Sequence, residues 1–143
     1  LFHDPRVLEA KKLLRDALSD AKAKIKEIKG PDKNVQVEYD ALNQARGHPT
    51  YFQYIGSGLG NGPLVQLIDG SVKLDFIGGI GPYYLGHNDL GLLDSQIESA
   101  LSNTIMQGNL QQNEDATQAM QSLIKASGMD HCFLSSSGAM ATE

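Results

Sequence analysis

Apolar residues recur with helical spacing along the first part of the chain. Asp4 suits the residue that caps a helix, and Pro5 suits its first turn. The Gly30-Pro31 pair is typical of a helix end, so the sequence predicts one helix between Pro5 and that pair. Its apolar stripe contains Val7, Leu14, Leu18, Ala21, Ile25 and Ile28. Such a stripe has to be buried against the protein body or a partner chain.

The next stretch predicts connections rather than regular structure. Residues Val35–Tyr39 alternate weakly between apolar and polar, and Gly47-His48-Pro49 is typical of a turn. A glycine-rich run follows at Gly56–Gly60. This run lacks the spacing of the dinucleotide-binding fingerprint and the Gly-Lys-Ser/Thr end of a P-loop. We therefore expect a mobile surface connection there.

A β-hairpin and a glycine-rich loop follow. Asp69-Gly70 is a strong two-residue hairpin signal, and apolar residues alternate on both sides of it. Ile77–Gly86 then contains four glycines and one proline. That backbone freedom suits a loop lining a cavity, although its two tyrosines could equally cover a hydrophobic interface. In the following Gly-His-Asn turn, we expect His87 to be a structural hydrogen-bonding residue. The strand residues are Val65, Leu67, Val72, Leu74 and Phe76.

Two further helices are predicted from their capping residues. Asp89 can cap the first, and Asn113 can cap the second. Ser127-Gly128 is a stop signal for the second helix. A break at Met106–Asn109 separates the two. The expected apolar faces are Leu93, Ile97, Ala100, Leu101 and Ile105 in the first, and Ala116, Ala119, Met120, Leu123 and Ile124 in the second.

The end of the chain has the pattern of a strand, a tight turn and the start of a helix. His131–Leu134 is a short apolar run that predicts a buried strand, with Cys132 inside it. Ser135–Gly138 then predicts a turn, and the good helix formers that follow predict a helix. The first amides of a helix have no intrahelical acceptor and lie at its positive end, so they bind phosphate readily. An ordinary serine cap explains the same residues without a ligand.

Composition narrows the class of protein. The chain has 143 residues, of which 41% are hydrophobic and 20% charged, as in a soluble domain with a modest core. It has no apolar run long enough to span a bilayer and no secretory leader, and its single cysteine excludes an intrachain disulfide. We expect a cytoplasmic protein without a metal site. Because the chain begins with Leu1 and stops at Glu143 inside a motif, we also expect it to be part of a longer polypeptide.

Charge is distributed unevenly. Residues 1–50 carry ten basic and eight acidic residues (+2), and residues 51–143 carry two basic and nine acidic (−7), which together give the net charge of −5. The lysines near the amino end alternate with apolar residues of the predicted helix. They therefore indicate the solvated face of that helix rather than a nucleic-acid surface.

Several of these motifs, taken in order, resemble one enzyme family. Asp69-Gly70 with Leu74-Asp75-Phe76, Gly79-Ile80-Gly81, Leu85-Gly86-His87 and Ser137-Gly138-Ala139 resemble the N-terminal portion of class III (ornithine/acetylornithine-type) pyridoxal-phosphate-dependent aminotransferases. The resemblance runs roughly from Tyr51 to Glu143. It implies an α/β fold, namely the incomplete N-terminal part of a fold-type-I transferase. On this basis we expect three segments: an N-terminal helical arm and connection (1–50), a β-hairpin with a glycine-rich active-site loop (51–88), and the start of the large cofactor-binding domain (89–143).

The same resemblance assigns roles to individual residues. It implies that Ser137, Gly138 and Ala139 bind the phosphate of pyridoxal 5'-phosphate. It implies that Ile80, with Tyr83 as a neighbour, lies on the substrate side of the cofactor. The break at Met106–Asn109 would lie near the interface of a homodimer. The reaction would transfer an amino group from an amino acid or ω-amine to a 2-oxo acid.

The resemblance is incomplete. No lysine stands in the context of the family's Schiff-base lysine, so no catalytic residue is assigned and we expect the chain alone to be inactive. Met140, Thr142 and Leu90 replace the family's usual glutamate, asparagine and proline. Two alternatives stay open: an aminomutase or decarboxylase of the same fold, and a non-enzymatic binding or assembly module.

Overall fold

The computed structural model describes residues 1–102 and 113–143, which divide into two units, Leu1–Glu98 and Ser99–Glu143. The predicted helix residue Ile105 and the predicted break at Met106–Asn109 lie outside the described residues.

The first helix, α1 (Pro5–Lys22), begins as predicted but ends early. The Asp4 carboxylate caps it by accepting the Arg6 backbone amide at 2.9 Å. The prediction that the helix continues to Gly30-Pro31 is wrong, because the residues after Lys22 leave the helix and pack against the rest of the first unit. Ile25 is only 2% exposed, and Lys29 exchanges backbone hydrogen bonds of 3.0 and 2.9 Å with Val72. Leu14 and Ile28, which were expected in the buried stripe, are exposed.

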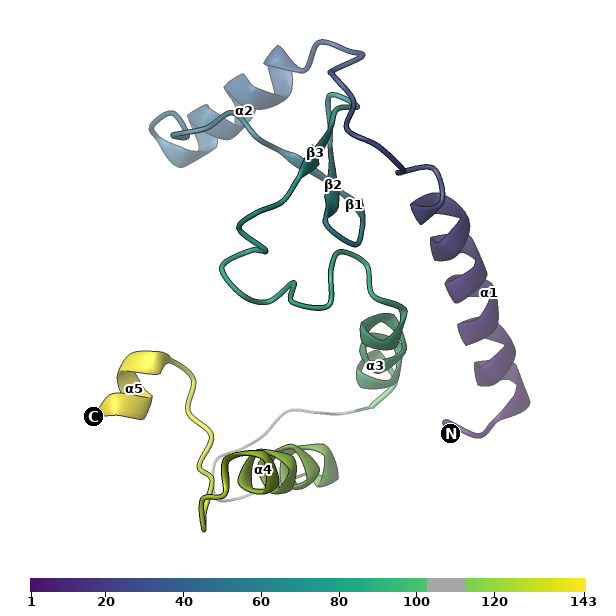
Figure 1. Cartoon of the computed structure of the whole chain (residues 1–143), viewed down its shortest axis with the longest axis vertical. Coiled ribbons are helices and arrows are strands. Elements are labelled where there is room, and N and C mark those ends of the chain that lie inside the picture. Colours follow the sequence, from purple (N-terminus) through teal and green to yellow (C-terminus); the bar gives the residue numbers. More distant parts are fainter. Residues whose placement is uncertain (103–112) are drawn as a thin grey trace. The chain divides into compact units, whose positions relative to one another are not determined.

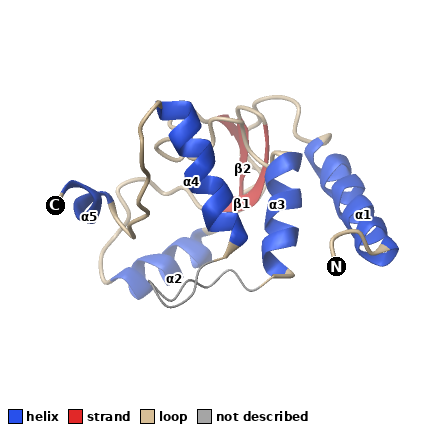
Figure 2. Cartoon of the chain, turned by 90° about the horizontal axis from the view of Figure 1, so that it is seen from below, coloured by secondary structure: helices blue, strands red, loops and turns tan. Residues whose placement is uncertain are grey.

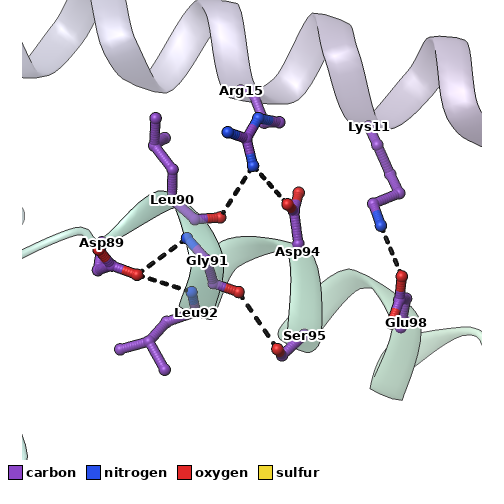
Figure 3. A network of polar contacts seen from close by, with 9 residues as sticks. All are labelled: Lys11, Arg15, Asp89, Leu90, Gly91, Leu92, Asp94, Ser95 and Glu98. Carbon is purple, nitrogen blue, oxygen red and sulfur yellow. Dashed lines mark hydrogen bonds and ion pairs between the residues drawn. The ribbon is translucent and has the colours of Figure 1, made fainter.

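Helix α1 meets helix α3 (Leu90–Ala100) through ion pairs (Figure 3). Lys11 Nζ donates to Glu98 Oε1 at 2.6 Å, and the Arg15 guanidinium pairs with the Asp94 carboxylate. This face of α1 therefore carries charged residues in addition to its apolar ones. Partly exposed ion pairs contribute roughly 0.2–1 kcal/mol each, so these two pairs add little to the stability of the first unit.

A second helix, α2 (Gln36–Arg46), forms where the sequence predicted a connection. Val35 and Tyr39 are buried, whereas Val37 between them is 78% exposed. Residues four apart share one face of a helix, so the weak alternation concealed a helical spacing. Gly47, at a left-handed φ of 77°, ends the helix.

The sheet has three antiparallel strands in the order β1 (Gly56–Asn61), β2 (Leu64–Leu67) and β3 (Val72–Leu74), shown as arrows in Figure 1 and in red in Figure 2. The predicted hairpin is confirmed, with Gly70 at a φ of 81°. The prediction that Gly56–Gly60 is a mobile connection is wrong. It forms most of β1 because β2 supplies backbone partners, which a strand needs more than it needs large side chains.

A small core holds the first unit together. Ser71 is completely buried and donates its hydroxyl to Asp69 Oδ1 at 2.6 Å, which lowers the pKa of Asp69. This hydrogen bond fixes the turn of the hairpin from inside. The buried apolar residues among those described are Ile25, Val35, Tyr39, Leu67 and Val72.

The helix starts predicted at Asp89 and Asn113 are confirmed. Helix α3 ends earlier than predicted, at Ala100, and both Ala100 and Leu101 of its predicted apolar face are exposed. Asp89 Oδ1 accepts the first amides of α3, from Gly91 at 2.9 Å and Leu92 at 3.0 Å. In the second unit, Asn113 Oδ1 accepts the Ala116 amide at 2.7 Å at the start of α4 (Glu114–Ser127). Gly128, at a left-handed φ of 71°, ends α4. The covered face of α4 is narrower than predicted: Ala116, Met120 and Ile124 are half-buried, while Ala119 and Leu123 are exposed.

Candidate functional site

A short helix, α5 (Gly138–Thr142), begins at the predicted turn. Ser137 is extended (φ −154°, ψ 157°), and its Oγ caps the helix by accepting the Met140 amide at 3.2 Å. Gly138 and Ala139 are the first two residues of the helix, so their amides have no acceptor within it. A Cβ added at Gly138 would meet nothing within 4 Å. The turn thus combines amide donors with open space.

The strand predicted before this turn does not form. Cys132 is half-buried rather than buried, and Phe133 is 89% exposed. A strand exists only through hydrogen bonds to a neighbouring backbone, and none of the residues that the structure describes pairs with His131–Leu134. The apolar run was therefore an insufficient signal.

The other two predicted site residues lie in the glycine-rich loop of the first unit. Ile80 is 91% exposed and has a left-handed φ of 63°, which a β-branched residue rarely adopts. Tyr83 is 45% exposed, and its ring lies 4.4 Å from the ring of His87, centroid to centroid. Tyr83 and His87 line a cavity of about 340 Å³ at the base of the loop, together with Asp75 and Tyr84. Ile80 does not line this cavity.

The best-defined polar contact at this cavity is the Asp75–His87 pair. Asp75 Oδ2 lies 2.8 Å from His87 Nε2, and their side chains are 16% and 13% exposed. Backbone amides and the imidazole lower the pKa of Asp75: the Gly78 amide has the largest effect, followed by His87, and Ile77 adds to it. His87 therefore makes a side-chain hydrogen bond, as was expected for this residue. The sequence analysis did not single out Asp75 as a site residue. An aspartate at the start of a turn typically accepts the backbone amides two and three residues further along the chain, as Asp75 does from Ile77 and Gly78.

The lowered pKa makes the contribution of Asp75 to stability dependent on pH. The folded state binds the proton of Asp75 less tightly than the unfolded state does. Its stabilisation is therefore complete above about pH 4 and is lost as the pH falls through the folded pKa. We expect Asp75→Asn to lower the melting temperature most near pH 7, with the difference from wild type shrinking towards pH 3. An exposed Asp16→Asn variant controls for net charge, and a pH-independent difference would contradict this prediction.

Within residues 1–102 and 113–143, no three His, Cys, Asp or Glu side chains gather closely enough to hold a metal ion. None of the helices in these ranges has both the length and the apolar character that crossing a membrane requires.

Comparison with known proteins identifies the family. The model of the class-III aminotransferases matches residues 44–143, which is well over half of the chain and includes the hairpin, the glycine-rich loop and the turn at Ser137. The chain belongs to the class-III aminotransferase family. No curated protein and no solved structure matches it significantly.

Family membership supports a transaminase-type enzyme. Class-III aminotransferases, as a family, depend on pyridoxal phosphate. The mixed architecture of helices and a small sheet is compatible with part of such an α/β protein. Ser137, Gly138 and Ala139 belong to the second unit, whereas Ile80 and Tyr83 belong to the first.

Proposed function

We propose that this chain is the N-terminal segment of a pyridoxal-phosphate-dependent aminotransferase of the ornithine/acetylornithine type. The complete enzyme transfers an amino group from an amino acid or ω-amine to a 2-oxo acid. The observation that carries this proposal is the family match over residues 44–143. The motifs in the sequence support the subtype, and the same resemblance supports a homodimer. The proposed cytoplasmic location rests on the composition of the chain alone.

The turn at α5 fits the phosphate of the cofactor. The amides of Gly138 and Ala139 lie at the start of α5, which is the positive end of the helix. A phosphate there is stabilised by hydrogen bonds and by the helix dipole. Ser137 Oγ accepts from Met140, and its hydroxyl proton remains available to donate. When bound, the cofactor would supply the electron sink for the reaction, while these residues would anchor it.

Ile80 and Tyr83 are proposed on the substrate side. Their loop offers exposed apolar surface, which suits contact with the side chain of a substrate rather than with its charged groups. In this role they would orient the donor and exclude water.

Amino transfer by the purified full-length protein tests the proposal. The protein is supplied with pyridoxal phosphate, a panel of amino acids and ω-amines, and 2-oxoglutarate as acceptor. We expect glutamate to form from at least one donor, and only when both cofactor and acceptor are present. Release of CO₂, or isomerisation of an amine without any acceptor, would instead indicate a decarboxylase or an aminomutase. A protein that takes up no pyridoxal phosphate would indicate a binding module.

A further inference from the structure

We propose that Asp75 and His87 form a positioning pair that fixes the glycine-rich loop between them. This loop, residues 76–86, presents Ile80 and Tyr83, so the inference rests on the proposed function. The pair acts through the loop, and neither residue is proposed to react with substrate.

Both ends of the loop are fastened to the same turn. The Asp75 amide donates to the Pro63 carbonyl at 2.9 Å, and the His87 amide donates to the Gly62 carbonyl at 2.9 Å. Gly62 and Pro63 connect β1 to β2, so the sheet holds the base of the loop. The contact between Asp75 and His87 side chains then closes this base with a third connection.

Asp75 also sets the first turn of the loop. While Oδ2 faces His87, Oδ1 accepts the amides of Ile77 at 2.9 Å and Gly78 at 2.8 Å. The Gly78 carbonyl in turn accepts the Tyr83 amide at 3.1 Å. A continuous set of hydrogen bonds therefore leads from the carboxylate to Tyr83.

His87 supports the loop with its ring as well. The Tyr83 and His87 rings are inclined by 31°, with centroids 4.4 Å apart. The pair is mostly covered, yet the loop above it is exposed. The left-handed backbone of Ile80 is unfavourable, so it persists only where its surroundings impose it. Without the contacts of Asp75 and His87 that hold the loop, Ile80 would be free to leave this conformation.

Two substitutions of His87 separate its hydrogen bond from its ring. His87→Phe keeps a ring beside Tyr83 but removes the N–H donor, whereas His87→Gln keeps an N–H donor and removes the ring. His48→Phe is the matched control, because His48 is exposed and its ring bonds only to the adjacent Pro49 carbonyl among the contacts described. Asp75→Asn is a milder second variant that loses the charge but keeps hydrogen-bonding atoms.

The variants are compared in the full-length protein by two measurements. The first is hydrogen exchange of a peptide covering residues 76–86, without added cofactor. The second is steady-state kinetics, with the Kd for pyridoxal phosphate measured separately. Losing a hydrogen bond to a charged group changes an equilibrium constant by roughly tenfold or more. For His87→Phe we therefore expect about tenfold faster hydrogen exchange of the loop and about a tenfold higher KM for the amino donor. The Kd for pyridoxal phosphate should change less than about twofold. His87→Gln should retain most of the wild-type behaviour, and Asp75→Asn should shift exchange and KM in the same direction as His87→Phe, by about threefold.

Three results would overturn the positioning role. They are unchanged exchange and KM in His87→Phe, equal effects of His87→Phe and His87→Gln, or an effect of His48→Phe as large as that of His87→Phe. If His87→Phe does not fold, the Asp75→Asn comparison decides. If the wild-type protein transfers no amino group, the proposed function fails, and the exchange measurement alone decides whether the pair fixes the loop.

Discussion

Replacing Gly138 with aspartate is expected to weaken the binding of pyridoxal phosphate by about 100-fold or more. The new carboxylate would lie at the start of α5, beside the amides proposed to bind the phosphate. Two unit charges about 5 Å apart repel by about 3 kcal/mol at an effective dielectric constant of about 20, which corresponds to about 100-fold in affinity. The phosphate carries more than one negative charge, so this figure is a lower bound.

The fold itself should accept this substitution. Gly138 does not have the positive φ that favours glycine, and an added Cβ meets no atom within 4 Å. A negative charge in the first turn of a helix is also favourable. Loss of cofactor binding would therefore reflect the site rather than unfolding.

The matched control is Gly30→Asp. It adds the same charge at another glycine with an ordinary φ and no atom within 4 Å of an added Cβ. Affinity is measured by titrating the cofactor-free full-length protein with pyridoxal phosphate. If Gly138→Asp and Gly30→Asp have equal affinities, Gly138 does not contact the phosphate.

Local signals in the sequence predicted the helix ends and the hairpin correctly. Asp4, Asp89 and Asn113 cap helices, and Asp69-Gly70 forms the hairpin turn. The serine at position 137 caps α5 in the same way. Each of these signals works within a few residues, because a short polar side chain satisfies nearby amides whatever the rest of the fold does.

The errors involve partners that lie far away in the sequence. Gly56–Gly60 became a strand because β2 pairs with it, and His131–Leu134 did not because nothing described pairs with it. Helix α1 ends at Lys22 because the chain beyond it makes other contacts in the first unit: Ile25 is buried in the core, and Lys29 pairs with Val72 of β3. No local pattern reports such pairings.

The candidate site divides in the same way. The helix start at Ser137 could be predicted from its own residues. Asp75 and His87 are twelve residues apart in the sequence, and they meet because both are hydrogen-bonded to the turn between β1 and β2. Assigning a cofactor to the turn required the family, because a serine-capped helix start is common in proteins that bind no phosphate.

Gly60→Ala is expected to destabilise the first unit by about 3 kcal/mol. Its Cβ would lie 2.5 Å from His87 Cβ and 2.6 Å from the Leu64 carbonyl oxygen. The Leu64 carbonyl belongs to the strand that pairs with β1, so it cannot move without disturbing the sheet. His87 would have to shift instead, which would weaken its contact with Asp75.

Gly56→Ala is the matched control in the same strand, because its Cβ would meet only the Gly58 amide nitrogen, at 3.9 Å. We expect a clear fall in the melting temperature of the full-length protein for Gly60→Ala and a small one for Gly56→Ala. Because Gly60 lies against His87, Gly60→Ala should also speed hydrogen exchange across residues 76–86, while Gly56→Ala should not. Equal melting temperatures for the two variants would mean that β1 and His87 are packed less closely than the structure shows. Unchanged exchange in a destabilised Gly60→Ala protein would mean that the loop is held independently of the sheet.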